Sequence, residues 1–382
     1  MSLPFTRSHY DVVIAGARCA GASTAMLLTR RGLRVLVVDP VHYGRDTLST
    51  HALMRGAVLQ LHRWGLLGAV RASGTPPIQS TTFHYGDETV EVLIKAGDGV
   101  DALYAPRRTV LDPVLVDAAR EAGAEVVYGQ SVVDLIRDDR GRVRGARIAG
   151  ADREVTDVSA DLVIGADGIR SRVARILEAE IDYAVPHAAC SIYGYWQDVP
   201  LEGYHWFYEL GMSIGTIPTN DGDTCVFVLI PQARFGERRH EGIEALFQEA
   251  VGAVSAELAE RVATSHPSGK LRAFAGAPGF LRRAAGPGWA LVGDAGYFRD
   301  PITAHGITDA LREAELLTRA VADNGDEGLK EYQPGRDALV KGLLDVTDRI
   351  SSFEWDLEEV KQHHLELNRE MNAQVDVLKA LA

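Results

Sequence analysis

The stretch DVVIAGARCAGASTAMLLTRRG, residues 11–32, decides the fold of this chain. Residues 11–15 form a short apolar run, which predicts a buried β-strand. The turn GARCAG follows at 16–21, then comes a helix-favouring stretch that ends at Gly32, and residues 34–39 (RVLVVD) predict a second strand. Strand, turn, helix and strand in this order predict a βαβ unit and therefore a parallel sheet.

The turn between the first strand and the helix has the features of a dinucleotide site. Gly16 allows a tight turn, Gly21 lets the helix pack closely on the strand, and the helix N-terminus offers N–H groups to a diphosphate. Asp39 ends the second strand, where a carboxylate can accept the hydroxyl groups of a ribose. Arg18 replaces the second glycine of the GxGxxG pattern, so we expect its side chain to pair with a phosphate. The predicted cofactor contacts here are Gly16, Arg18, Cys19, Ala20, Gly21 and Asp39.

The remaining pattern predicts an α/β protein with a discontinuous Rossmann-like domain, an inserted and mainly antiparallel β-sheet domain, and a helical C-terminus. We assign residues 1–80, 100–185 and 270–325 to the first domain, 81–99 and 186–269 to the inserted substrate-binding sheet, and 326–382 to the C-terminal helical segment. Apolar periodicity predicts a helix over 48–67 that Ser49 or Thr50 would cap. Further helices are predicted over 307–322, 336–350 and 356–381.

The composition of the 382 residues excludes several classes of function. Hydrophobic residues make up 46% and charged residues 24%, and no run reaches the roughly 20 apolar residues of a membrane span, so we expect a globular protein without a stable membrane anchor. A formal charge of −13 argues against nucleic acid as a partner. The three cysteines lie far apart and no metal-binding pattern occurs, so neither disulfides nor a metal site are expected. The first residues lack an apolar signal segment, which predicts a cytoplasmic location.

Two later segments distinguish a flavin dinucleotide from a nicotinamide dinucleotide. LVIGADGIRSR at 162–172 places Asp167 and Gly168 after a buried strand, and LVGDAGYFRDPITAHGI at 291–307 places Asp294 after another. Together with GARCAG and Asp39, these segments resemble, in the same order, the motifs of the para-hydroxybenzoate hydroxylase-like FAD-dependent monooxygenases. That superfamily also contains flavin-dependent halogenases and geranylgeranyl reductases. The resemblance covers nearly the whole chain.

The resemblance implies FAD as the cofactor, with Asp294 binding the ribityl hydroxyls, Asp167 and Gly168 beside the pyrophosphate, and Arg108 contacting the phosphate region. It further implies cofactor contacts at Arg45, Ser49, Thr50, Val132, Ala304, Gly306 and Ile307, and candidate catalytic residues at Pro301 and His305. A helix that starts near His305 would aim free N–H groups at the negative charge of a reduced flavin. The alternatives are a turn cap for Asp294 and a solvated loop side chain for Arg45.

Aromatic residues gather on the strands predicted between 186 and 231. Alternation along SIYGYWQDV puts Tyr193 and Tyr195 on one face of the sheet. We expect that face to line a pocket for a flat substrate, with ordinary sheet packing as the alternative. The predicted substrate-pocket residues are Tyr193, Tyr195, Trp206 and Tyr208.

These features favour an FAD-dependent monooxygenase that uses NADPH or NADH, captures dioxygen as a flavin C4a-hydroperoxide and hydroxylates an aromatic or polycyclic small molecule. The main alternative is a flavin-dependent reductase of an unsaturated, isoprenoid-like substrate. A halogenase is disfavoured because no WxWxIP stretch occurs and Lys95 is the first lysine of the chain. A non-catalytic flavin-binding protein is also considered, because the long C-terminal helix could dock a partner or pair two copies as a homodimer.

Overall fold

The first sheet is built around the predicted βαβ unit. The computed structural model describes residues 5–151, 153–199 and 201–381. The sheet has the strand order β17-β18-β8-β1-β2-β5, and β6 and β7 extend it beyond β8. β1 (His9–Ala15) runs parallel to β2 (Val35–Asp39) and to β8 (Val155–Gly165). The other strands are β5 (Glu125–Tyr128), β6 (Ser131–Arg137), β7 (Val143–Ala149), β17 (Ala285–Gly286) and β18 (Trp289–Leu291).

Helices cover one face of this sheet, and the hairpin of β6 and β7, which is paired to the first part of β8, folds over the other face. α1 (Cys19–Arg30), α4 (Arg108–Glu121) and the first part of α9 (Gly306–Ser351) bury their apolar sides with Val12, Ile14 and other residues of the strands. On the opposite face, β6, β7 and the short helix α5 (Arg172–Ile176) pack on alternate strand residues. Both faces are therefore buried, and this explains the uninterrupted apolar runs of β1 and β2.

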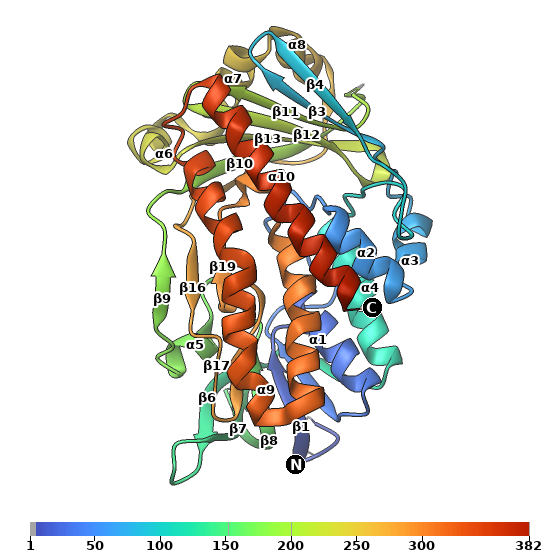
Figure 1. Ribbon diagram of the computed structural model, residues 1–382, viewed down its shortest axis with the longest axis vertical. Coiled ribbons are helices and arrows are strands. Elements are labelled where there is room, and N and C mark those ends of the chain that lie inside the picture. Colours follow the sequence, from blue (N-terminus) through green and yellow to red (C-terminus); the bar gives the residue numbers. More distant parts are fainter. Residues whose placement is uncertain (1–4, 152, 200, 382) are drawn as a thin grey trace.

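The second sheet lies above the first domain in Figure 1 and has the order β14-β10-β13-β12-β11-β3-β4, with β15 paired to β10. The pairings are antiparallel except between β11 and β3. α6 (Gln232–Arg238), α7 (Ile243–Val254) and α8 (Ala256–Thr264) follow β13, and α7 packs on the outer face. The strands of the second sheet are β3 (Ser80–Tyr85), β4 (Glu88–Leu93), β10 (Ala189–Gln197), β11 (Tyr204–Glu209), β12 (Met212–Pro218), β13 (Asp223–Pro231), β14 (His266–Pro267) and β15 (Arg272–Phe274).

Three details differ from the sequence-based expectations. The helix predicted over 48–67 begins only at Arg55, as α2 (Arg55–Arg63), and α3 (Leu67–Ala72) is a separate helix. Neither Ser49 nor Thr50 caps α2, because the left-handed φ of 49° at His51 separates them from the helix. The segments 307–322 and 336–350 belong to one element, α9, whose two arms reverse direction at Gly325 (Figure 1). β15 lies within the range given to the first domain but pairs with the second sheet.

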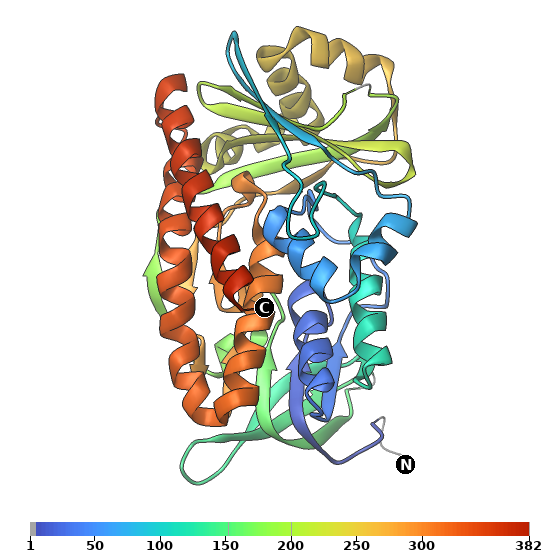
Figure 2. The same cartoon turned by 45° about the vertical axis from the view of Figure 1, so that its right-hand side comes forward.

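The C-terminal helix α10 (Leu357–Ala380) connects the two layers, as both ribbon views show (Figures 1 and 2). Its start is fixed by a capping box in which the Asp356 side chain accepts the Glu359 N–H while the Glu359 side chain accepts the Asp356 N–H. One side of α10 packs along α9, and its beginning approaches the second sheet. A small third sheet joins β9 (Ile181–Ala184), β16 (Phe280–Arg282) and β19 (Tyr297–Phe298). Among the described residues, no helix combines the length and apolarity that a membrane span needs.

Candidate functional site

The turn after β1 is packed too tightly for any side chain at its two glycines. Gly16 has a φ of 107°, and a Cβ there would lie 2.4 Å from the Ala166 carbonyl oxygen. A Cβ on Gly21 would lie 1.8 Å from the Gly16 carbonyl oxygen. The start of α1 therefore lies directly against the ends of β1 and β8. Because Gly16 and Gly21 have no side chains, neither residue covers the N–H groups of this helix start. This backbone arrangement suits a diphosphate.

Asp39 closes the same turn from the end of β2. Its buried carboxylate accepts the Ala17 N–H at 2.8 Å and the Val41 N–H at 2.7 Å. A carboxylate has about four acceptor positions, so two remain for ribose hydroxyls. Asp39 thus orders the turn and keeps capacity for a ligand, and its role in binding ribose stays a prediction.

The segment 41–54 between β2 and α2, here called the connecting loop, joins the dinucleotide turn to the second sheet. The half-buried Arg18 donates a hydrogen bond to the Thr47 hydroxyl, so within the described structure its guanidinium is held by the loop. The Ser49 N–H donates to the Tyr193 hydroxyl at 3.0 Å. Arg45 is exposed and has no side-chain partner among the described residues, and Thr50 is partly exposed. The phosphate role of Arg18 and the flavin role of Arg45, Ser49 and Thr50 stay predictions.

Arg108 lies beneath the start of α1 and is held by a buried ion pair. Its guanidinium donates to both Asp112 oxygens, at 2.9 and 3.0 Å. The Cys19 thiol also donates to Asp112, at 3.2 Å, and burial raises the pKa of that thiol above its usual range. Asp112 therefore fixes the Arg108 guanidinium, Cys19 stays a neutral thiol, and the contact of Arg108 with a phosphate stays a prediction.

Asp294 is a carboxylate without a partner in the described part of the chain. It lies in a 3₁₀ turn, Gly293–Ala295, directly after β18, and it makes no hydrogen bond or ion pair with the described residues. Burial and the negative charge of Asp309 raise the pKa of Asp294 to about 6, and Arg108 opposes this shift. The turn is held instead by the Gly293 N–H, which donates to Glu313 at 2.9 Å. Asp294 therefore does not act as a turn cap and is available as an acceptor.

Asp167, in contrast, already has its partners within the protein. Its carboxylate accepts from the Ser171 hydroxyl at 2.5 Å and from the N–H groups of Arg172 and Val173 at 2.6 and 3.2 Å, so it stabilises the start of α5. Gly168 follows with a φ of 80° at the edge of the sheet where β8 ends. Val132 is buried in β6, which pairs with β7. The cofactor roles of these residues stay predictions.

The start of α9 is open, whereas the residues before it are tightly held. Gly306 is exposed, and a Cβ there would find no atom within 4 Å. The buried His305 has its Nδ1 2.7 Å from the Thr303 carbonyl oxygen, and burial beside Arg299 lowers its pKa to about 4, so it is neutral at pH 7. Ala304, with a φ of 53°, ends the turn that Pro301 begins, and Ile307 is buried. The open first turn of α9 offers N–H groups and a positive dipole end to a ligand.

A network of buried charged side chains holds the start of α9 in place. Asp309, in the first turn of α9, accepts from Arg299 at 2.7 Å and from Arg312 at 2.6 Å. Neither guanidinium reaches solvent, since the side chains of Arg299 and Arg312 are 2% and 1% exposed. The next acid along the helix, Glu313, holds the Gly293 N–H. The network therefore fixes the Asp294 turn and the first turn of α9 relative to each other.

One face of the second sheet turns aromatic residues toward the first domain, whereas Trp196 packs on Phe247 of α7 on the other face. All four predicted pocket residues are buried and share one cluster with the connecting loop and α10: Tyr193, Tyr195, Trp206 and Tyr208. Tyr208 packs on Trp355 and His364, near the start of α10, so it lies away from the loop. Tyr193 and Tyr195 instead lie beside the loop. Their role as pocket residues stays a prediction.

Sequence reasoning missed two residues at this contact, His51 and Arg107. His51 Nε2 lies 3.1 Å from the Tyr195 hydroxyl, its Nδ1 lies 3.1 Å from the Ala105 carbonyl oxygen, and burial lowers its pKa to about 3. The Arg107 guanidinium lies 3.6 Å from the centre of the Tyr195 ring. A lone histidine inside an apolar helical pattern carries no local signal, and neither does Arg107, whose contacts are with residues distant in sequence.

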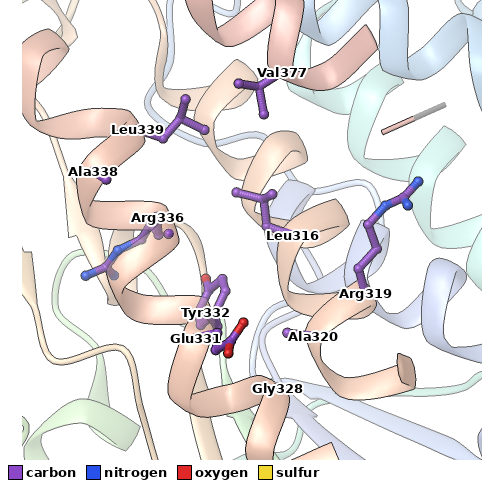
Figure 3. A pocket seen from close by; sticks show the side chains of 11 residues that line it. Leu316, Arg319, Ala320, Gly328, Glu331, Tyr332, Arg336, Ala338, Leu339 and Val377 are labelled. Carbon is purple, nitrogen blue, oxygen red and sulfur yellow. The ribbon is translucent and has the colours of Figure 1, made fainter. Parts of the chain in front are cut away.

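A separate groove of about 530 Å³ lies between the two arms of α9, with Val377 of α10 on its rim (Figure 3). Leu316, Tyr332 and Leu339 line it, and Arg336 turns its charged end away from the opening. None of the predicted cofactor or substrate residues lines this groove. It therefore does not belong to the candidate site.

The chain is similar to proteins of known family. The chain matches the family described as FAD binding domain over residues 9–347. The digeranylgeranylglycerophospholipid reductase of Methanothrix thermoacetophila is 26% identical over 85% of this chain and 82% of its own length. The menaquinone reductase of Mycolicibacterium smegmatis is 26% identical over 82% of this chain and 77% of its own.

Solved structures show the same fold. A triple mutant of a flavin-dependent brominase superposes with a TM-score of 0.81 at 20% identity, covering 98% of this chain and 97% of that one. PqsL of Pseudomonas aeruginosa in complex with 2-aminobenzoylacetate superposes with a TM-score of 0.78 at 21% identity, covering 95% of this chain and 100% of that one. The expected α/β fold with a discontinuous dinucleotide domain is thereby confirmed.

Replacing the unpartnered carboxylate tests its role directly. Asp294→Ala is expected to weaken FAD binding by roughly ten- to a hundredfold, because a charge-assisted hydrogen bond contributes about 1.5–3 kcal/mol. Fluorescence titration of the apoprotein with FAD measures this. Asp345→Ala is the matched control, since Asp345 lies in the second arm of α9 and accepts a hydrogen bond from the Tyr183 hydroxyl of β9. Equal FAD affinity in Asp294→Ala and wild type would contradict the assignment.

Proposed function

The chain belongs to the FAD binding domain family, and on this premise we propose that it is an NADPH- or NADH-using monooxygenase that hydroxylates an aromatic or polycyclic small molecule. The observation that carries this proposal is the buried aromatic face that the second sheet turns toward the connecting loop. Tyr193 and Tyr195 are 2% and 5% exposed there, next to Ser49 and His51. Flat, electron-rich rings pack well against such side chains.

The residues present fit FAD as the resident cofactor. The turn at Gly16 and Gly21 leaves backbone space for a diphosphate, and Asp39 retains acceptor positions for a ribose. Asp294 offers an unpartnered carboxylate for further hydroxyl groups. These groups suit the adenosine, diphosphate and ribityl parts of one molecule. When bound, FAD supplies hydride acceptance and the activation of dioxygen.

The residues around the cofactor would provide electrostatics and a dry environment. The first turn of α9 presents N–H groups that stabilise negative charge, and Gly306 leaves room in front of them. His305 is neutral and buried, so stabilisation of that negative charge rests on the N–H groups of the helix start and not on an imidazolium. The buried tyrosines would orient the substrate ring and exclude water, which favours oxygen transfer over release of peroxide. No protein nucleophile is needed in this reaction.

A second candidate activity is the reduction of a carbon–carbon double bond in an isoprenoid-like substrate. This activity is favoured by the similarity of the chain to a digeranylgeranylglycerophospholipid reductase and to a menaquinone reductase. A long isoprenoid chain needs an extended apolar channel. The aromatic face beside the connecting loop instead suits a compact ring, and this difference makes hydroxylation the first proposal.

Oxygen use distinguishes the two activities. We expect the purified protein to be yellow, and its absorbance at about 450 nm to be bleached anaerobically by NADPH or NADH. In air, an aromatic substrate should then be converted with uptake of one dioxygen per product molecule, measured with an oxygen electrode and mass spectrometry. Saturation of an isoprenoid double bond under anaerobic conditions, with no hydroxylated product in air, would overturn the proposal in favour of the reductase.

Filling the open space at the start of α9 tests where the flavin lies. Gly306→Val should fold normally, because a Cβ there meets no atom of the described residues within 4 Å apart from its own chain neighbours and helix backbone, yet it should slow flavin reduction and reoxidation. Gly335→Val is the matched control, since Gly335 also lies in α9 with no atom within 4 Å of an added Cβ. Stopped-flow rates measure the effect on flavin reduction and reoxidation, and thermal midpoints measure the effect on stability. Wild-type rates in Gly306→Val would remove this helix start from the active site.

A further inference from the structure

Gln374 connects the C-terminal helix to both arms of α9. It is 4% exposed, although most of α10 is in contact with solvent on one side. Its side-chain oxygen accepts a hydrogen bond from the Arg312 Nη1, in the first arm of α9. Its side-chain nitrogen donates to the Leu339 carbonyl oxygen at 3.0 Å, in the second arm. A neutral amide can satisfy a cation and a carbonyl group at once, and a hydrocarbon side chain can satisfy neither.

Arg312 depends on this contact because few other groups hold its guanidinium. The same Nη1 donates to Asp309 at 2.6 Å, while Nε and Nη2 have no hydrogen-bond partner among the described residues. A small cavity of about 30 Å³ lies beside it, between the start of α9 and α10, and is also lined by His305 and Thr308. Packing therefore leaves the guanidinium some freedom on that side, and its orientation is set by Asp309 and Gln374.

The orientation of Arg312 bears on the cofactor site through Asp309. The Asp309 carboxylate lies in the first turn of α9 and is held on its other oxygen by Arg299. Its charge also acts on Asp294, the unpartnered carboxylate of the site. A competing acceptor exists, because one buried Glu313 oxygen has no hydrogen-bond partner and lies 3.9 Å from Arg312 Nη2. Without Gln374, the guanidinium can turn toward Glu313, which weakens its hold on Asp309.

We propose that Gln374 is a positioning residue for FAD: through Arg312 and Asp309 it holds the first turn of α9 in place and thereby sets the affinity and the midpoint potential of the bound flavin. This inference rests on the proposed function only for the presence of FAD, not for hydroxylation. It gives α10 a role at a site that the helix does not enter. Nothing in the sequence around Gln374 sets it apart from the other polar residues of the helix.

The test compares two variants of Gln374 with two controls. Gln374→Leu removes both hydrogen bonds, whereas Gln374→Glu keeps an acceptor for Arg312, loses the donor to the Leu339 carbonyl oxygen and adds a negative charge. Gln60→Leu is the buried control, because Gln60 on α2 donates to the Leu311 carbonyl oxygen of α9 at 3.0 Å without a hydrogen bond to Arg312. Gln362→Leu is the exposed control on α10. The readouts are the FAD dissociation constant, the flavin midpoint potential and the thermal midpoint of the apoprotein.

We expect Gln374→Leu to weaken FAD binding by about three- to tenfold and to shift the midpoint potential, since a hydrogen bond to a charged group is lost. Gln374→Glu should bind FAD within about threefold of wild type but have a lower midpoint potential, because added negative charge disfavours the reduced flavin. Gln60→Leu should lower the thermal midpoint and leave the potential unchanged. Gln362→Leu should change none of the three quantities.

The proposal is overturned if both Gln374 variants keep the wild-type potential and FAD affinity, whatever their stability. It is also overturned if Gln60→Leu shifts the potential as much as Gln374→Leu, because the effect would then come from loss of packing on α9. If Gln374→Leu does not fold, Gln374→Asn, an uncharged amide one methylene too short to keep both hydrogen bonds, takes its place in the comparison. A wild-type protein that binds FAD but hydroxylates nothing would refute the proposed function and leave this inference standing.

Discussion

The Asp309 carboxylate, buried between Arg299 and Arg312, is the interaction on which the candidate site depends. Charged groups without solvent must be paired, and removing one member of such a set typically costs about 3–5 kcal/mol. Here both guanidinium groups converge on one carboxylate in the first turn of α9. The neighbouring Glu313 holds the Gly293 N–H, so the same helix also fixes the turn after β18. An open helix start and a free carboxylate are thereby held close to one another.

The parallel sheet and the connecting loop bring further candidate cofactor and substrate residues close to the start of α9 and the Asp294 turn. The carboxyl ends of β1, β2, β8 and β18 meet at one edge of a parallel sheet, which is where ligands bind in open α/β folds. The connecting loop leaves this edge after β2 and reaches the second sheet through Ser49 and His51. The predicted cofactor residues and the buried tyrosines are therefore linked by one short segment. Movement of the connecting loop would therefore affect both the predicted cofactor residues and the buried tyrosines.

Local patterns predicted much of this structure, and tertiary contacts decided the remainder. The βαβ unit, the glycine turn and Asp39 could be found because strand periodicity and turn chemistry are written in consecutive residues, and Asp294 could be found because its segment resembles a family motif. Residues 48–54 of the connecting loop were predicted as part of a helix because their apolar spacing is helical, whereas His51 is held by Ala105 and Tyr195, which are distant in sequence. Arg107 and Gln374 act through such distant partners too, and a single sequence does not encode those pairings in any local pattern.

The pH dependence of FAD binding is the most direct measurement of the central claim. Since burial and Asp309 raise the pKa of Asp294 to about 6, and a hydroxyl donor stabilises the ionised carboxylate, FAD affinity should rise as the pH increases through about 6. The pKa values of Asp300 and Glu313 are also raised, each to about 7, so the comparison must be made between wild type and Asp294→Asn. Fluorescence titrations from pH 5 to pH 8 should show a steeper rise for wild type than for the variant. Identical pH profiles for the two proteins would contradict the account.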